Sequence, residues 1–161
     1  MTDARDHRPL RVLFVCTGNS ARSLLGEVLL RAAGGDAFEV HSAGTHPRGV
    51  NPLTIRVLGE AGLPTDGLRS KSVDEYLDQD FDYVITVCDD ANESCPVFPG
   101  ASRRLHWSFP DPSRAVGTHE ERLAVFRAVR DAMKGRIEEF LMTAGEEDKG
   151  KTRPAPGRRR K

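Results

Sequence analysis

The chain has 161 residues, of which 38% are hydrophobic and 30% are charged, and its 24 Lys and Arg balance its 24 Asp and Glu. This length suits one domain that buries about two-thirds of the surface its unfolded chain exposes. No apolar run is long enough to span a bilayer, which excludes a membrane-spanning protein, so we expect a soluble chain with no membrane partner.

Three cysteines, Cys16, Cys88 and Cys95, are the first functional clue. The first eleven residues contain acidic side chains and no apolar segment, unlike a secretory signal, so we expect a cytoplasmic protein. In a reducing compartment, cysteines are more often catalytic, metal-binding or redox-active than structural. Each cysteine is therefore a candidate functional residue.

The first elements along the chain alternate between strand and helix. Residues 10–16 are an apolar run that ends at a Thr-Gly-Asn turn, which predicts a buried parallel strand. Residues 21–33 place apolar side chains at three-four spacing and predict an amphipathic helix, which ends at Gly34 and Gly35. A second strand is predicted over 38–42.

The middle of the chain repeats this alternation. A helix over 52–61 is predicted by Asn51 at the N-cap, by Pro52 at the first helical position and by Gly62 just past the end. Residues 81–88 resemble the first strand in pattern and again deliver a cysteine at the carboxyl end of a strand.

A weaker strand at 103–107 precedes a long final helix. Thr118 and Glu121 form a predicted capping box at its start, and its apolar residues recur every three or four positions: Leu123, Phe126, Val129, Met133, Ile137, Phe140 and Leu141. Alternating strands and helices predict a single α/β domain with a four-stranded parallel sheet, helices on both faces and ligands at the carboxyl ends of the strands.

Residues 9–143 form the predicted domain, and residues 144–161 form a predicted disordered basic tail. The tail has seven Lys and Arg and three Asp and Glu, which leaves 17 and 21 in the rest of the chain, a net charge of −4. The tail could contact nucleic acid or an acidic partner. A solvated terminus is the simpler interpretation, so we expect no specific nucleic-acid partner.

The strongest local pattern lies between the first strand and the first helix and reads Cys16-Thr17-Gly18-Asn19-Ser20-Ala21-Arg22-Ser23. Five residues between Cys and Arg let the backbone curl into a cradle whose amides point inward, beside the positive end of the helix dipole. Gly18 and Asn19 tolerate the positive φ that such a curl requires. Arg22 supplies a planar fork that can bind two oxygens of a tetrahedral oxyanion.

Cys16 is the predicted nucleophile of this cradle. The positive surroundings are expected to lower the pKa of its thiol and so favour the thiolate, and Ser23 could donate a hydrogen bond to the sulfur. A cysteine after a strand can instead be a small core residue. The combination of residue types in a strand-to-helix setting favours the functional interpretation.

The cradle resembles that of the low-molecular-weight protein tyrosine phosphatase fold family. Phosphatases of that family also carry a late Asp-Pro whose Asp is the general acid, and the matching residues here are Asp111 and Pro112. An Asp-Pro can also mark an ordinary turn. Its position after the last strand, where loops meet the ligand edge, favours a role for Asp111 as an acid.

Two further cysteines need an explanation that phosphate hydrolysis does not give. The segment from Cys88 to Cys95, with its flanking sequence CDDANESCPVFPG, resembles arsenate reductases that share the phosphatase fold and are coupled to thioredoxin. SAGT at 42–45, VNP at 50–52 and HW-x-F-x-DP extend the resemblance, which runs from about Leu10 to Phe140. A second thiol suits a reductase, because arsenic(V) in a thiolate adduct accepts two electrons.

The resemblance implies a role for each matching residue. Cys16 attacks arsenate, the loop from Thr17 to Ser23 with Arg22 binds its oxygens, and Asp111 assists the loss of water. Cys88 then attacks Cys16 and releases arsenite. Cys95 attacks Cys88, which leaves a Cys88–Cys95 disulfide for thioredoxin to reduce.

We predict no cofactor and no bound metal. Some relatives bind potassium through residues equivalent to Asn19, Glu27 and Ser42, but the later part of that site corresponds here to Arg69 and Lys71. A lysine could replace the cation electrostatically.

Two alternative functions remain. The first is a low-molecular-weight protein tyrosine phosphatase with incidental cysteines, and some phosphatase activity is compatible with either function. The second is a sensor or binding module in which Cys88, Cys95 and His106 hold zinc or report oxidation. The thiol donor also stays open, because glutathione, mycothiol or glutaredoxin could take the place of thioredoxin.

Overall fold

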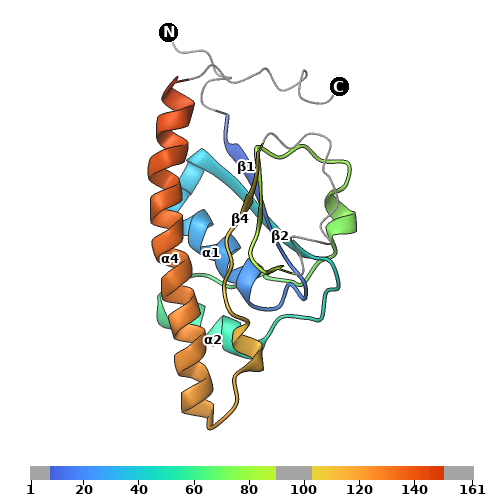
Figure 1. Cartoon of the computed structure of the whole chain (residues 1–161), viewed down its shortest axis with the longest axis vertical. Coiled ribbons are helices and arrows are strands. Elements are labelled where there is room, and N and C mark those ends of the chain that lie inside the picture. Colours follow the sequence, from blue (N-terminus) through green and yellow to red (C-terminus); the bar gives the residue numbers. More distant parts are fainter. Residues whose placement is uncertain (1–7, 90–102, 151–161) are drawn as a thin grey trace.

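Four parallel strands form one sheet in the order β2-β1-β3-β4. This computed structural model describes residues 8–89 and 103–150 of the chain. The strands are β1 (Leu10–Cys16), β2 (Phe38–Gly44), β3 (Tyr83–Thr86) and β4 (Arg103–His106). Each neighbouring pair is parallel, as Figure 1 shows, so the predicted four-stranded parallel α/β fold is confirmed.

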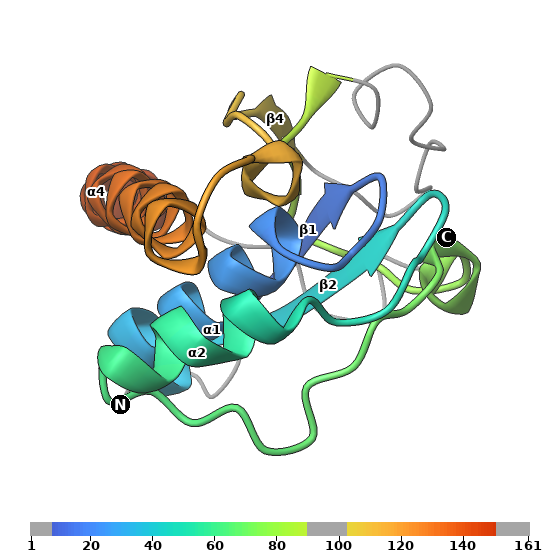
Figure 2. The ribbon, with the colours of Figure 1, turned by 90° about the horizontal axis from the view of Figure 1, so that it is seen from below.

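The described helices are distributed unequally over the two faces of the sheet. The α-helices α1 (Arg22–Gly34), α2 (Pro52–Glu60) and α4 (His119–Gly150) contact one another and lie on one face (Figure 2). In the described part of the chain, the opposite face carries a single-turn 3-10 helix, η3 (Val73–Tyr76), whose Tyr76 ring packs against His41 and Phe81. Two more single turns, η2 (Gly35–Ala37) and η4 (Pro112–Arg114), lie in connections.

The ends of the helices follow the predicted capping residues. The Asn51 side chain accepts a hydrogen bond from the Leu53 amide at 2.8 Å, and Pro52 opens α2. At the start of α4, the Thr118 amide donates to Glu121 Oε1 at 2.8 Å, and the Glu121 amide donates to Thr118 Oγ1 at 3.1 Å. The predicted capping box is therefore confirmed.

The core on the helical face joins the sheet to α1 and α4. Phe14 of β1 lies so close to α1 that a Cβ on Gly26 would be 2.8 Å from its ring. Trp107 packs edge-on against Phe14 and Phe140, with ring centroids 5.8 and 5.7 Å apart. Trp107 is therefore a core residue, and its two ring contacts join the end of β4 to β1 and α4.

Helix α4 extends further than the sequence predicted. Its apolar stripe continues to Ala144, which is buried, and the helical backbone reaches Gly150. The helix therefore runs past the predicted boundary at residue 144, since adding a residue to an existing helix costs far less than starting one. Residues 151–161 lie outside the described residues. None of the described helices is both long enough and apolar enough to cross a membrane.

Strand register brings two cysteines to the same edge of the sheet. Val15 of β1 lies opposite Thr86 of β3, and the Val87 amide donates to the Val15 carbonyl at 2.9 Å. Cys16 is therefore the last residue of β1, and Cys88 lies two residues past the end of β3. The two cysteines are at the carboxyl ends of adjacent strands. This is the edge at which parallel α/β sheets bind ligands.

Candidate active site

The loop from residue 16 to residue 22 is held from outside by a segment that follows β2. Backbone amides of this segment donate to loop carbonyls at 2.8–3.1 Å, in the pairs Thr45 to Cys16, His46 to Thr17, Arg48 to Gly18 and Asn51 to Ser20. Because these carbonyls point outward, the loop amides are left to face inward. The Asn19 amide, for example, donates to Cys16 Sγ at 3.2 Å.

Backbone conformation and close packing affect different positions in and beside this loop. Asn19 has a φ of 45°, which is the left-handed conformation that the sequence predicted for it. Gly18 does not have a positive φ, which corrects the prediction; a Cβ there would lie 2.8 Å from Arg48 Nε, at the end of a flexible side chain. Gly44 of β2 is required beside the loop, since a Cβ would lie 2.5 Å from the Thr17 carbonyl oxygen.

Cys16 is buried at the base of the loop, with 2% of its surface exposed. Burial raises the pKa of its thiol, and the side-chain hydrogen bond with Ser23 and the amides of Ser23 and Asn19 only partly offset this effect. The predicted lowering of the pKa is therefore wrong for the loop without a bound anion, because loss of solvation outweighs the hydrogen bonds. The predicted contact with Ser23 is confirmed, with 2.8 Å between Sγ and Oγ.

Replacing Ser23 with alanine should slow the alkylation of Cys16. The Ser23 hydroxyl accepts from Asn19 Nδ2 at 2.7 Å, so its own hydrogen is available to the sulfur and stabilises the thiolate. Losing this bond raises the pKa of Cys16 further, so less thiolate is present at neutral pH. We expect iodoacetamide to react about tenfold more slowly at pH 7, with the rate profile moved to higher pH.

The matched control for this experiment is Ser72→Ala, which alters a serine that caps η3. Alkylation of Cys16 in the control should follow the wild-type pH profile. A Ser23→Ala protein with an unchanged profile would show that the Ser23 hydroxyl does not stabilise the thiolate.

Arg22 and Asp111 meet across the mouth of the loop. Arg22 Nη1 donates to the Phe109 carbonyl at 3.1 Å, and its Nη2 lies 3.5 Å from Asp111 Oδ2. Burial favours the neutral form of Asp111, but hydrogen bonds from Ser113 and the charges of Arg22 and Arg48 lower its pKa below the usual value. Asp111 is therefore a carboxylate at neutral pH, and its proposed role as an acid requires a proton from another group.

Cys88 lies beside the loop and is also buried, with 4% of its surface exposed. Its Sγ is 3.3 Å from the Thr17 hydroxyl, and Cys16 and Cys88 are both free thiols. In the next residue, Asp89, Oδ1 lies 2.8 Å from His106 Nε2. The structure thus brings two of the three predicted cysteines together, whereas Cys95 lies outside the described residues.

The loop opens into a cleft of about 770 Å³. Arg22, Cys88 and Asp111 line it, as the sequence predicted for the site. It is also lined by residues that the sequence did not suggest: His46, Arg48, Asp89, Ser108, Phe109, Pro110 and Arg114. These residues lie in connections without a recognisable motif, and the only available signal was their place after strand ends.

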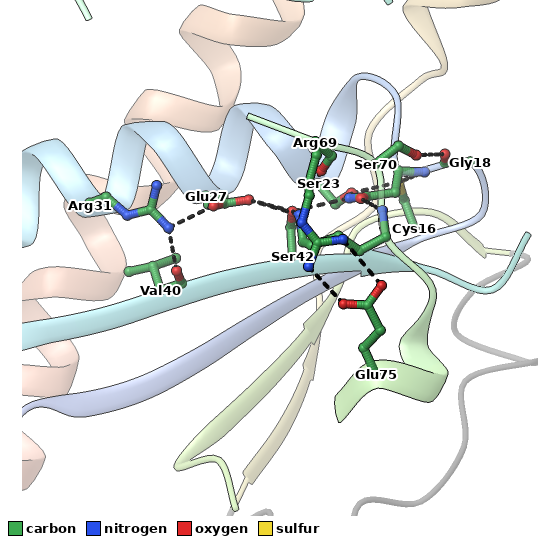
Figure 3. A network of polar contacts seen from close by, with 12 residues as sticks. Cys16, Gly18, Ser23, Glu27, Arg31, Val40, Ser42, Arg69, Ser70 and Glu75 are labelled. Carbon is green, nitrogen blue, oxygen red and sulfur yellow. Dashed lines mark hydrogen bonds and ion pairs between the residues drawn. The ribbon is translucent and has the colours of Figure 1, made fainter. Parts of the chain in front are cut away.

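A buried polar network that includes Glu27 and Ser42 contacts Ser23 through the loop residue Asn19 (Figure 3). Ser42 Oγ donates to Glu27, and Asn19 Nδ2 donates to Ser42 Oγ at 3.1 Å. The Lys71 ammonium lies 3.2 Å from Ser42 Oγ and 3.6 Å from Glu27 Oε1. Burial lowers the pKa of Lys71, and Glu27 opposes this. A charge of the chain itself thus lies among the three residues that bind potassium in some relatives, which leaves them a poor fit for an added cation.

Replacing Lys71 with methionine should destabilise the fold. Lys71 and Glu27 have side chains that are only 6% and 9% exposed, so the change leaves a buried carboxylate with Arg31 as its remaining cation. We expect the free energy of unfolding to fall by roughly 3 kcal/mol, measured by urea denaturation. The double variant with Glu27→Gln should recover much of the loss. Equal stability of Lys71→Met and wild type would show that the pair does not support the fold.

Known proteins share this arrangement of elements. The sequence profile of the low molecular weight phosphotyrosine protein phosphatase family matches residues 11–150. An arsenate reductase of Halalkalibacterium halodurans is 42% identical over 132 residues, which cover 82% of this chain and 95% of that protein.

Solved structures agree with the sequence comparison. An arsenate reductase in the phosphate binding state has a TM-score of 0.72 at 28% identity, covering 83% of this chain and 98% of its own. The thioredoxin-dependent arsenate reductase of Corynebacterium glutamicum has a TM-score of 0.65 at 27% identity, covering 86% of this chain and 63% of its own. The similarity in both kinds of comparison therefore spans the fold that carries the cleft.

Proposed function

The chain belongs to the low molecular weight phosphotyrosine protein phosphatase family, and from this and its paired thiols we infer that it is an arsenate reductase. The observation that carries the proposal is a pair of thiols. Cys16 lies in the loop, and Cys88 lies beside it, with its Sγ 3.3 Å from the Thr17 hydroxyl. Hydrolysis of a phosphate ester needs only the first thiol. A second thiol within reach of the loop allows two electrons to be transferred.

The first step forms a bond between sulfur and arsenic. Arsenate enters the loop, where the inward amides and the Arg22 guanidinium replace its hydration shell. The Cys16 thiolate attacks arsenic(V), and one arsenate oxygen leaves as water. Asp111, a carboxylate in the free site, takes a proton from the Cys16 thiol or from the protonated anion and passes it to the leaving oxygen.

The second step reduces the arsenic. The Cys88 thiolate attacks the sulfur of Cys16, so that a Cys16–Cys88 disulfide forms while the sulfur–arsenic bond breaks. Both electrons of the broken bond stay on arsenic, which leaves as arsenite. The two thiols have lost two electrons in total, and arsenic has gained two.

The last step clears the loop for another turnover. The Cys95 thiolate attacks Cys88 and releases Cys16 as a thiolate, which leaves a Cys88–Cys95 disulfide. A dithiol protein then reduces this disulfide, and we propose thioredoxin because Cys95 lets the chain complete the disulfide by itself. The structural relative from Corynebacterium glutamicum, which is described as thioredoxin-dependent, supports this choice. The cytoplasm is the proposed location, because its reducing conditions keep Cys16 and Cys88 free.

One experiment tests the proposal directly. Reduced protein is incubated with one equivalent of arsenate and no thiol donor, arsenite is quantified, and disulfides are mapped by mass spectrometry. We expect about one arsenite per chain and a Cys88–Cys95 disulfide. Intact arsenate with all thiols reduced would reject the reductase, and turnover of an aryl phosphate by the same sample would then favour the phosphatase alternative.

A further inference from the structure

Arg48 is an exposed residue whose backbone belongs to the support of the oxyanion loop. Its amide donates to the Gly18 carbonyl at 2.9 Å. The Ser70 hydroxyl donates to the same carbonyl at 3.2 Å and accepts from the Gly49 amide at 3.1 Å (Figure 3). Two independent contacts therefore fix the backbone of this residue to the middle of the loop.

The Arg48 side chain turns back over the loop. A Cβ built on Gly18 would lie 2.8 Å from Arg48 Nε, 3.1 Å from Nη2 and 3.3 Å from Cζ. All three atoms belong to the guanidinium group, which therefore lies against the loop backbone and lines the same cleft as Arg22 and Asp111. A glycine at position 18 leaves room for this close approach.

Other arginines of the cleft already have partners. Arg22 is bonded to the Phe109 carbonyl and lies 3.5 Å from Asp111, and Arg114 lies 3.8 Å from the same carboxylate. Among residues 8–89 and 103–150, no side chain forms a hydrogen bond or an ion pair with the Arg48 guanidinium. Its five N–H donors are therefore available to an anion that enters the cleft.

We propose that Arg48 is a second residue for oxyanion recognition, whose guanidinium binds an arsenate oxygen that faces the mouth of the cleft. Arg22 and the loop amides bind the oxygens that face inward. The proposal rests on the proposed function, since it takes arsenate as the anion. Because Arg48 is exposed and lies against Gly18, whereas Cys16 is buried, it contributes to binding of the anion more than to the chemical steps.

The test uses inorganic phosphate, a tetrahedral anion that the thiols do not reduce. Phosphate affinity is measured by calorimetry for wild type, Arg48→Gln and Arg48→Lys, and KM and kcat for arsenate are measured with a coupled thiol donor. Arg48→Gln should weaken phosphate binding and raise KM about tenfold, the effect of one charged hydrogen bond, with a smaller change in kcat that reflects only the loss of its charge near Asp111. The phosphate affinity and the KM of Arg48→Lys should lie between those of wild type and Arg48→Gln, since lysine keeps the charge and loses the planar fork.

Arg56→Gln is the matched control, because this exposed arginine of α2 pairs with Glu60 and does not line the cleft. It should bind phosphate as wild type does. Wild-type phosphate affinity in Arg48→Gln, or a loss confined to kcat, would overturn the proposal. If neither wild type nor any variant reduces arsenate but Arg48→Gln still weakens phosphate binding, the role of Arg48 in anion binding stands and the reductase function fails.

Discussion

Replacing Cys88 with serine should abolish arsenate reduction and leave the oxyanion loop intact. Serine is close in size to cysteine and can keep the contact with the Thr17 hydroxyl, which lies 3.3 Å from Cys88 Sγ. Cys16 can still form its adduct with arsenate, but the variant lacks the thiol that is proposed to break the sulfur–arsenic bond. We expect the rate of arsenite formation to fall by at least about 10³-fold, the scale of losing a nucleophile.

The loop itself serves as the internal control for this variant. Phosphate affinity and the alkylation of Cys16 by iodoacetamide should stay close to wild type, and any hydrolysis of an aryl phosphate should persist. This combination separates a reductase from a phosphatase, since the two activities share Cys16 and only one needs Cys88. Arsenite production at the normal rate by Cys88→Ser would remove Cys88 from the mechanism.

Replacing Cys95 with serine should stop turnover with thioredoxin and still allow a single round of reduction. Cys16 and Cys88 alone supply two electrons, so one arsenite per chain should form and a Cys16–Cys88 disulfide should accumulate. Cys16 then stays oxidised, because no third thiol releases it. Arsenite is quantified after mixing with excess arsenate, and the trapped disulfide is identified by mass spectrometry.

Together, the two cysteine variants distinguish the role of Cys88 from that of Cys95. Cys88→Ser should give no arsenite, whereas Cys95→Ser should give one equivalent and then stop. Normal steady-state turnover of Cys95→Ser with thioredoxin would exclude Cys95 from the relay. A Cys95→Ser protein that releases no arsenite in the first round would instead place Cys95, and not Cys88, in the attack on Cys16.

The charge states of the site explain why the free protein is not already primed for attack. Burial raises the pKa of Cys16, whereas the pKa of the partly buried Asp111 is lowered by its hydrogen bonds from Ser113 and by the nearby charge of Arg22. In the free site, the proton is therefore on sulfur and the negative charge is on the carboxylate. In the proposed mechanism, arriving arsenate takes over Arg22, which removes a cation from Asp111 and favours movement of the proton toward the carboxylate.

Local patterns were sufficient for the elements and for the central residues of the site. The run before Cys16, the five-residue spacing to Arg22 and the capping residues Asn51 and Thr118 each act within a few positions of the chain. Backbone conformation at such short range depends on residue type and on hydrogen bonds between near neighbours. The strands, the helix starts, the Ser23 contact and the positive φ of Asn19 were predictable for this reason.

Contacts between distant segments decided what the sequence pattern left open or gave incorrectly. Arg48 reaches the loop because the chain after β2 runs beside it, and Lys71 meets Glu27 because the Lys71 carbonyl accepts a hydrogen bond from the Gly44 amide at the end of β2. The pKa of Cys16 was predicted in the wrong direction, since a motif shows nearby donors and does not show how much solvent is lost. Thus the sequence determined that a nucleophilic thiol sits in an oxyanion loop, and the tertiary structure, through burial and long-range register, determined its protonation and which charges surround it.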